Sequence, residues 1–324
     1  MTNSQMNPET KTYDDPLKKR KGERRLVVID GNHLIHRAYH AIQAPLKTSS
    51  GEQTNAIFGF ASMLLNIIEL EQPDYLAMTF DERAPTFRHE AHEGYKATRV
   101  KAPDELYAQI PRIKEMINDF KIPVYSKEGF EADDMMGTLA HKAIKDGLSV
   151  YIVTGDRDLL QLVDPTIHVV FPHKGYREPM VYDSKAVLEK FGIHPNQMVD
   201  YKALVGDPSD NIDGVQGIGP KGAAELLTQY KTLDGIYQHL RDVSEGMRKK
   251  LTEGKTAAYF AQSLSKIVTD VPCDFKKEDT STKKLDFLGL QKFFEKMEMR
   301  SLQTRLKKLM PAEALQSKEQ MSLF

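Results

Sequence analysis

Two kinds of apolar pattern alternate along the first half of the chain. Short apolar runs have the length of buried parallel strands, and they are 26–29, 75–80, 122–124, 150–153 and 167–171. Longer stretches with apolar residues at helical spacing lie between them, and they are 54–70, 104–117 and 131–146. This alternation predicts an α/β fold, a mainly parallel sheet flanked by helices, over residues 25–194.

The pattern changes at Pro195 to short helices separated by glycine turns. A helix predicted over 198–205 is followed by a polar turn, and the glycine-rich stretch 214–224 opens a further helix. Pro220 suits a first helical position, and the free amides of such a helix start can hold a phosphate. A single glycine-rich turn is weak evidence, but this one joins two helices. We therefore expect a helical region up to residue 310 that contains a helix-hairpin-helix clamp for duplex DNA backbone.

The composition narrows the class of protein. The chain has 324 residues, of which 40% are hydrophobic and 28% charged, as in a soluble globular protein. Its one cysteine, Cys273, excludes an internal disulfide and fits a reducing cytoplasm. No apolar run reaches membrane-spanning length, so we expect no membrane association. The net charge of −1 does not exclude a nucleic-acid partner, because it sums acidic and basic patches that can lie apart. Nothing requires more than a monomer.

Both ends of the chain are polar and are expected to be flexible tails, over 1–24 and 311–324. The first tail carries the basic run Lys18-Lys19-Arg20-Lys21. This run could add weak affinity for phosphate, or it could be only a solvated extension.

Aspartates follow three of the predicted strands. Asp30 follows 26–29, Asp81 follows 75–80, and Asp156 and Asp158 follow 150–153. Because the carboxyl ends of parallel strands lie at one edge of a sheet, these carboxylates should converge there. A further acidic run, Glu131-Ala132-Asp133-Asp134, opens the helix before the third of these strands. Several carboxylates without a histidine or thiol among them favour Mg²⁺ or Mn²⁺. The alternative is that each aspartate only caps a turn or a helix.

Basic and aromatic residues are interleaved after Asp81, at Arg88, Tyr95, Lys96 and Arg99. On a helix these side chains would share one face, where cations could hold phosphates and rings could stack on the bases of a single strand. The alternative is a solvated charged helix. Gly94 would interrupt such a helix, which suggests two short helices or a mobile arch. A zinc site is not supported, because the nearby histidines lack a third ligand.

These segments together resemble the flap-endonuclease superfamily and, within it, the 5′-nuclease domain of bacterial DNA polymerase I and its stand-alone relatives. The resemblance covers about residues 26–300. The motifs that carry it are Val28-Ile29-Asp30-Gly31, Phe80-Asp81, Thr86-Phe87-Arg88, Tyr95-Lys96-Ala97-Thr98-Arg99, Glu131-Ala132-Asp133-Asp134, Thr154-Gly155-Asp156-Arg157-Asp158, and the stretch from Gly206-Asp207 to Ala223. Pro208, Asp213 and Gly222 depart from the residues usual in the family, which bears on hairpin affinity and on a potassium site.

The resemblance implies roles for individual residues. One metal site would be surrounded by Asp30, Asp81, Glu131 and Asp133, with Asp134 close by, and the other by Asp156, Asp158, Asp207 and Asp210. A helical arch over about 82–103, through which a 5′ single strand passes, would carry Arg88, Tyr95, Lys96 and Arg99. Arg37 would face the substrate. The hairpin residues Gly214, Gly217, Gly219 and Lys221 would hold the downstream duplex, with a K⁺ ion in many family members.

The implied function is a structure-specific 5′-3′ exonuclease and 5′ flap endonuclease that uses two Mg²⁺ ions in DNA replication or repair. No polymerase segment follows the predicted last helix, so a stand-alone nuclease is expected. Two alternatives remain open: a flap-DNA-binding module with degenerate catalysis, and a ribonuclease of the PIN-like type. The C-terminal residues Gln320, Leu323 and Phe324 resemble the bacterial sliding-clamp-binding motif, although a frayed terminus or intramolecular packing would also accommodate them.

Overall fold

The protein is built on a six-stranded sheet with strand order β3-β2-β1-β4-β5-β6. The computed structural model describes residues 17–311. Neighbouring strands from β3 to β5 pair in parallel, and only β6, at one edge, is antiparallel. The strands are β1 (Arg25–Asp30), β2 (Tyr75–Thr79), β3 (Val124–Tyr125), β4 (Ser149–Val153), β5 (Ile167–Phe171) and β6 (Met180–Tyr182). The predicted fold class, a mainly parallel sheet flanked by helices, is confirmed.

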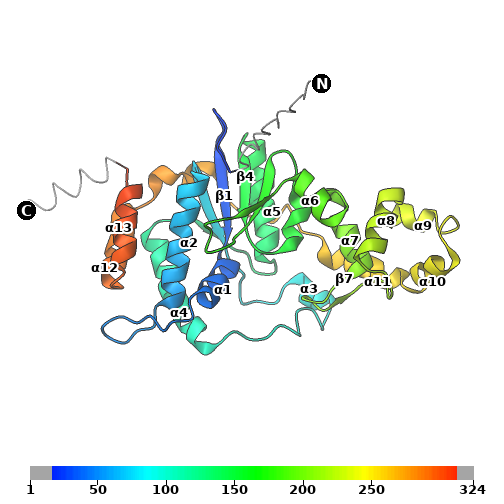
Figure 1. The fold of residues 1–324 in the computed structure, drawn as a ribbon, viewed down its shortest axis with the longest axis horizontal. Helices are drawn as coiled ribbons and strands as arrows, with labels where there is room; N and C mark the ends of the chain where they lie inside the picture. The colour runs from blue at the N-terminus through cyan, green and yellow to red at the C-terminus, as the bar shows by residue number, and fades with distance from the viewer. Residues whose placement is uncertain (1–16, 312–324) are drawn as a thin grey trace, which may run out of the picture.

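Helices cover both faces of this sheet (Figure 1). The helices of this half of the chain are α1 (Gly31–Ala41), α2 (Asn55–Glu71), α3 (Phe87–Ala91), α4 (Asp104–Asp119), α5 (Ala132–Lys145) and α6 (Ser184–Phe191), of which α3 lies away from the sheet. Side chains of β1 alternate between the two faces, as the pleat of a strand requires. Val27 and Ile29 pack in a core with α2 and α4, whereas Leu26 and Val28 pack in a second core with α5. The strand is therefore buried on both sides, which explains why it reads as one unbroken apolar run.

The second half of the chain adds a helical region beside the sheet, on the right of Figure 1. Its elements are α7 (Met198–Val205), β7 (Gly206–Asp207), β8 (Ile212–Asp213), α8 (Pro220–Tyr230), α9 (Leu233–Gln238), α10 (Glu245–Glu253) and α11 (Lys255–Ser265). The helix predicted over 198–205 and the helix start at Pro220 are both present. Between α7 and α8 lie the short antiparallel pair β7–β8 and the glycine hairpin.

The last helices return to the sheet. These helices, α12 (Phe287–Lys296) and α13 (Arg300–Leu309), bury Phe293, Leu302 and Leu306 in the core formed with α2 and α4. They lie at the opposite end of the molecule from α8 and α9 (Figure 1). The segment expected to form one helical region is thus divided between the two ends of the protein. No helix within residues 17–311 is long and apolar enough to cross a membrane.

The described part of the predicted basic tail contacts the body of the protein. Lys19 pairs with Asp74 at 2.6 Å, and a guanidinium nitrogen of Arg24 donates to the backbone oxygen of Asp146. Residues from Lys19 onward are therefore not a free tail.

The segment between α3 and α4 differs from its prediction. Only Phe87–Ala91 is helical, and the chain then runs through turns to Pro103, below α1 in Figure 1. Lys96 has a left-handed φ of +56°, and its amide donates to the backbone oxygen of Asp210. The Asn211 side chain in turn donates to the backbone oxygen of Gly94. Arg88, Tyr95 and Arg99 therefore do not share a helical face, because contacts with the helical region replace helical hydrogen bonds here, and the chain is non-helical at Gly94, where an interruption was expected.

Candidate active site

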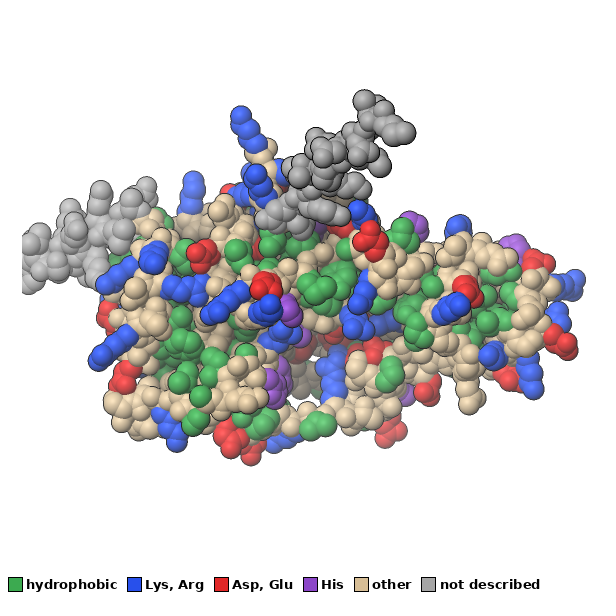
Figure 2. Space-filling view, in the orientation of Figure 1, with side chains coloured by type: hydrophobic (Ala, Val, Ile, Leu, Met, Phe, Trp, Pro, Cys, Tyr) green, Lys and Arg blue, Asp and Glu red, His purple; other side chains and the backbone are tan. Residues whose placement is uncertain are grey.

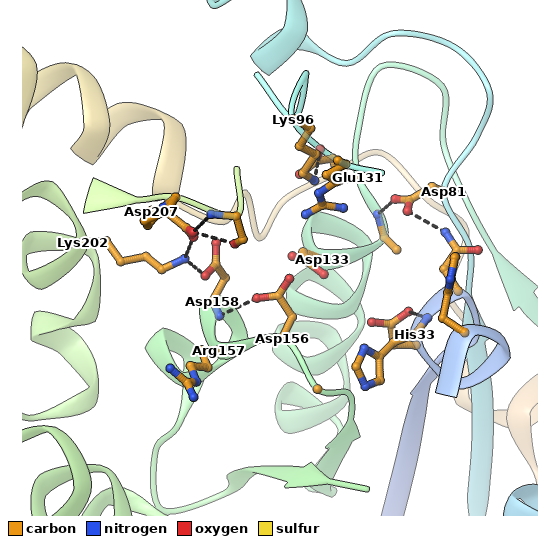
Figure 3. Close-up of a pocket in the computed structure, with 18 of the residues that line it drawn as sticks. His33, Asp81, Lys96, Glu131, Asp133, Asp156, Arg157, Asp158, Lys202 and Asp207 are labelled. Carbon is orange, nitrogen blue, oxygen red and sulfur yellow. Dashed lines mark hydrogen bonds and ion pairs between the residues drawn. The ribbon is translucent and has the colours of Figure 1, made fainter. Parts of the chain in front are cut away.

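The carboxyl ends of the central strands meet in one acidic cavity of about 800 Å³. Asp30 ends β1, Asp81 follows β2 and Asp156 follows β4, and these three strands are neighbours in the sheet. Glu131 and Asp133 come from the start of α5, Asp158 from the 3-10 helix Arg157–Leu162 that follows β4, and Asp207 from β7 in the helical region. All seven side chains line the same cavity (Figure 3). The predicted convergence of the strand-end carboxylates is confirmed by this arrangement.

Four of these residues are called the sheet-edge group here: Asp30, Asp81, Asp133 and Asp156. Neutral donors orient Asp30, Asp81 and Asp156, the last through the Asp158 amide at 2.9 Å. Asp30 accepts from the His33 amide at 2.9 Å and from the Thr154 hydroxyl at 2.8 Å. Asp81 accepts from the Ala132 amide at 2.8 Å, which ties it to the start of α5. No lysine or arginine within residues 17–311 forms an ion pair with any of the four.

The sheet-edge group carries negative charge that burial makes costly. Burial raises the pKa of Asp30 to about 7, and the charges of Asp81 and Asp156 add to this effect against hydrogen bonds from His33 and Thr154. Burial also raises the pKa of Asp133, with Asp156 and Asp30 as the next causes. Closely spaced carboxylates of this kind are stabilised by cations that accept oxygen ligands. The donor set therefore fits a hard divalent ion.

A second set, called the loop-side cluster here, consists of Asp158, Asp207 and Asp210. Carboxylate oxygens of these three residues all lie within 4.8 Å of one another. Unlike the sheet-edge group, they are paired with cations of the chain. The Lys202 ammonium contacts both Asp158 and Asp207, and Arg99 lies 2.5 Å from Asp210. Burial alone would raise the pKa of Asp207, but Lys202 and hydrogen bonds from Ser209 leave it lowered.

Glu131 lies between the two sets and is held by three donors, of which the Arg88 guanidinium is the most distant, at 3.4 Å. The Lys96 ammonium is 2.6 Å from one of its oxygens, and the Tyr95 hydroxyl is 3.0 Å from the other. The same hydroxyl lies 3.2 Å from Asp210, so Tyr95 links Glu131 to the loop-side cluster. Its ring is only 5% exposed. The expectation that this ring stacks on a base is therefore corrected, whereas Lys96 and Arg99 do line the cavity.

Arg88 and Asp134 are corrected as well, because neither lines the cavity. They form a buried bidentate pair with distances of 2.7 and 2.8 Å. Arg88 also donates to the backbone oxygens of Leu264 and Lys266, and Asp134 accepts from the amide of Val268. With every polar atom of the pair engaged, Asp134 has no free oxygen for a metal and Arg88 no free nitrogen for a phosphate. The pair fixes α3 and the start of α5 against the segment after α11.

Several residues at the cavity were not singled out by the sequence patterns. His33 lines it, and a side chain on Gly155 would overlap the His33 ring at 2.1 Å, so only glycine fits there. Burial, together with the charge of Arg37, lowers the pKa of His33 to about 4. Lys202 lies in the last turn of α7, five residues before Asp207. Its position shortly before the acidic turn that contains Asp207 is the only sequence feature that indicates a role for this lysine in the cavity.

The remaining predicted DNA contacts lie on the outside of the cavity. Arg37 is half-buried on α1 and is not among the lining residues. Figure 2 shows Lys, Arg and His side chains around the hollow below the centre of the molecule.

In the hairpin, Gly217 has a φ of +79°, and a side chain on Gly214 would collide with the backbone of residues 204–206. Gly219 precedes α8 and is open to its surroundings, and the Lys221 side chain is 92% exposed. The C-terminal Gln320, Leu323 and Phe324 lie outside the described residues.

An acidic cavity at the carboxyl ends of a parallel sheet, next to a glycine hairpin that opens a helix, is the arrangement of a nuclease. Comparison with known families gives the same class. The model described as "5'-3' exonuclease, N-terminal resolvase-like domain" matches residues 25–192, and "5'-3' exonuclease, C-terminal SAM fold" matches residues 193–287. The chain belongs to this 5′-3′ exonuclease family.

Relatives of known identity are bacterial DNA polymerases. The chain is 42% identical over 284 residues to DNA polymerase I of Caldicellulosiruptor bescii, a match that covers 87% of this chain and 33% of the relative. It is 41% identical over 287 residues to the thermostable DNA polymerase I of Thermus thermophilus, covering 89% and 33%. The chain thus spans about a third of the length of the relatives that it matches.

Solved structures share the fold at low sequence identity. T5 5′-exonuclease with bound zinc ions has a TM-score of 0.63 at 20% identity, covering 85% of this chain and 99% of that one. The catalytic core of Rad2 in complex with DNA has a TM-score of 0.56 at 17% identity, covering 89% and 92%. These likenesses show a shared fold over 85–89% of this chain.

Proposed function

We propose that the chain is a metal-dependent, structure-specific 5′ nuclease that hydrolyses phosphodiester bonds in DNA as a 5′-3′ exonuclease and 5′ flap endonuclease. The observation that carries this proposal is the meeting of seven carboxylates with Lys96 and Arg99 in one cavity. Carboxylates supply ligands for cations, and the two basic side chains supply charge for a phosphate. A site of this composition suits a substrate that brings its own negative charge.

The residues divide into two ligand sets. Asp30, Asp81, Glu131 and Asp133 would hold one divalent ion, and Asp156, Asp158, Asp207 and Asp210 the other. Bound Mg²⁺, or Mn²⁺ in its place, would lower the pKa of an attacking water and stabilise the leaving 3′ oxygen, which leaves a 5′-phosphate product.

Lys96 is the residue of this chain best placed to act on the phosphate itself. Its ammonium is 2.6 Å from Glu131 and lines the cavity, so a rotation of the side chain would bring it to a phosphoryl oxygen. A well-placed donor of this kind contributes about 2.7–4 kcal/mol to transition-state stabilisation. His33 cannot add to this charge near neutral pH, because its pKa is lowered to about 4.

The hairpin supports a duplex DNA substrate. The open amides at the start of α8 and the exposed Lys221 suit phosphate backbone, and a K⁺ ion at the hairpin would add to this contact. Two of the similar solved structures were determined with DNA: the T5 flap endonuclease, as a pseudo-enzyme-product complex with metal ions, and the Rad2 core. The segment over 92–103 would lie beside the 5′ single strand.

The decisive experiment is cleavage of a labelled 5′ flap DNA with and without Mg²⁺, read at nucleotide resolution. We expect Mg²⁺-dependent products at the junction of the flap and from the 5′ end. Tight flap binding without any metal-dependent product would identify a binding module instead. A parallel RNA/DNA hybrid flap tests the ribonuclease alternative, which predicts faster cleavage of the hybrid than of all-DNA flap.

A role in primer or flap removal during replication or repair would follow from this activity, with the chain acting as a monomer at the nucleoid. We further propose that the tail segment with Gln320, Leu323 and Phe324 docks to a sliding clamp through its two apolar side chains. Clamp affinity should be lost when the chain is shortened to end at Lys318. Equal clamp binding by the shortened and full chains would discard this tether.

A further inference from the structure

Lys202 occupies a specific position within the loop-side cluster. It projects from α7, and its ammonium contacts an oxygen of Asp158 and lies 2.5 Å from an oxygen of Asp207 (Figure 3). The side chain is only 11% exposed, and the two carboxylates are 14% and 13% exposed. One partly buried cation of the chain is therefore shared by two acidic side chains.

A divalent ion cannot use both carboxylates while this contact persists. An ion that took one oxygen from Asp158 and one from Asp207 would need the space where the ammonium lies, since the ammonium touches an oxygen of each. The two cations would also repel each other at that distance. The flexible four-carbon stem of a lysine allows its ammonium to leave without movement of the helix that carries it. A divalent ion can therefore replace the Lys202 ammonium without a backbone rearrangement.

The sheet-edge group offers a contrast within the same cavity. No lysine or arginine among the described residues forms an ion pair with Asp30, Asp81, Asp133 or Asp156. Of the four carboxylates proposed for the first ion, Lys96 pairs only with Glu131, whereas Lys202 contacts both Asp158 and Asp207 of the loop-side cluster. The two sets should therefore differ in affinity for the same ion.

We infer that Lys202 is the resident counter-ion of the loop-side cluster, and that it makes binding of a second divalent ion weak by competing for Asp158 and Asp207. Without the divalent ion, Lys202 keeps the two carboxylates from repelling each other. Once displaced, its ammonium is free to meet the phosphate of an incoming strand, a step that rests on the proposed function. Lys202 is thus a positioning residue that couples the second ion to the substrate.

The inference is tested by Mn²⁺ titration of the full chain in the absence of nucleic acid, followed by calorimetry or by the magnetic resonance signal of free Mn²⁺. The variants are Lys202→Met, which removes the charge, and Lys202→Arg, which keeps it. Lys185→Met is the matched control, because it removes one exposed lysine on α6 that pairs with Glu189 at 3.8 Å.

The wild type should bind one ion tightly and a second weakly. In Lys202→Met we expect the weak site to tighten by about tenfold or more, which corresponds to about 1.4 kcal/mol, while the tight site changes less than about twofold. Lys202→Arg and Lys185→Met should retain a weak second site. Unchanged or weaker second-ion binding in Lys202→Met would overturn the inference, because it would mean that the lysine supports the ligands instead of competing with the ion.

Thermal unfolding gives a second readout that a merely structural lysine would not produce. In EDTA, the melting temperature of Lys202→Met should be lower than that of the wild type. Addition of Mn²⁺ should raise the melting temperature of Lys202→Met by more than it raises that of the wild type. An EDTA deficit that Mn²⁺ leaves unchanged would count against the exchange. If Lys202→Met does not fold, Lys202→Gln takes its place in both measurements. A wild type that binds no Mn²⁺ at all would overturn the metal-dependent function too, so the two failures are distinguishable.

Discussion

The sheet and the helical region hold their functional groups by different means. At the sheet edge, Asp30 and Asp81 are oriented by amides and neutral side chains, so their negative charge remains available to a bound ion. In the helical region, lysine side chains fix the functional groups. Lys202 forms an ion pair with Asp207, and Lys250 donates to the backbone oxygen of Gly217 at 2.9 Å. Neutral donors give a rigid and charged site, whereas lysine partners give a neutralised site that other cations and phosphates can enter by exchange.

This difference suggests a division of labour within the cavity. Strand ends and a helix start have little freedom, which suits ligands that must stay in place between turnovers. Loops held by long cationic side chains can rearrange when a substrate arrives, which suits groups that engage only then. The predictions below test the two halves of this comparison, beginning with the sheet edge.

The largest effect is expected for Asp156→Asn. The change removes a charged side chain after β4 while preserving its size. Mg²⁺-dependent cleavage should fall by more than about a thousandfold, which exceeds the rate loss on removal of a single hydrogen-bond donor to the transition state. DNA binding, measured by fluorescence anisotropy, should be largely spared. Asp183→Asn is the control, since Asp183 caps α6 and lies away from the cavity. Full turnover by Asp156→Asn would contradict the assignment.

Arg88→Met should have the largest effect on stability. Arg88 is 2% exposed and paired with the fully buried Asp134, so its loss leaves an uncompensated buried charge. Breaking such a pair costs about 3–5 kcal/mol, measured here by urea unfolding. The matched change Arg99→Met should cost less than about 1 kcal/mol, because the Arg99 side chain is 49% exposed. Similar losses of unfolding free energy in the two variants would show that the buried Arg88–Asp134 pair does not stabilise the protein more than the exposed Arg99 contact does.

Asp133→Asn and Asp207→Asn should shift stability in opposite directions when divalent ions are removed with EDTA. Burial and the charges of Asp156 and Asp30 raise the pKa of Asp133, so the amide should increase the free energy of unfolding. Against the effect of burial, Lys202 lowers the pKa of Asp207, so the amide there should decrease it. With Mg²⁺ at a hundredfold excess over its Kd, the wild type should gain about 2.7 kcal/mol. Asp133→Asn should lose most of that gain and Asp207→Asn should keep most of it.

The sheet edge should also show a pH signature through His33. Its folded-state pKa of about 4 lies below the ordinary value, so the unfolded chain takes up the proton first as the pH falls. The resulting loss of stability is absent above about pH 6.5 and grows to about 2 kcal/mol at pH 5. Unfolding in EDTA at pH 7 and pH 5 should therefore show a smaller pH effect in His33→Gln than in the wild type. Because the pKa of the neighbouring Asp30 is shifted as well, the comparison of the two proteins isolates the contribution of His33.

The parts of the site that the sequence predicts are those fixed by local periodicity. Apolar runs identify strands, parallel strands share an edge, and residues such as Asp30 and Asp156 follow directly from that placement. The same holds for Pro220 at the start of α8, since proline suits a first helical position. Each of these inferences depends on the residue types within a single short segment of the sequence.

The other parts depend on contacts between distant segments, which no local pattern contains. Arg88 looked like an exposed arch residue, but its partner Asp134 lies 46 residues further along the chain. The turn at Lys96 is set by the backbone oxygen of Asp210, far along the chain. Charge explains the error at Arg88. A lone basic residue in the sequence predicts solvent or phosphate, and only the fold shows that a carboxylate of the same chain is its partner.

The smallest expected effect concerns the hairpin and separates geometry from charge. Lys250 donates to the Gly217 oxygen, whereas its neighbour Lys249 lies 3.9 Å from Glu253 on the same helix. Lys250→Met should weaken DNA binding by about fivefold, the effect of one hydrogen bond worth about 1 kcal/mol. Lys249→Met, which removes the same charge, should weaken it less at equal ionic strength, measured by anisotropy. Equal losses would mean that the hairpin keeps its shape without a lysine, and that cationic side chains fix only the loop-side cluster of Asp158, Asp207 and Asp210.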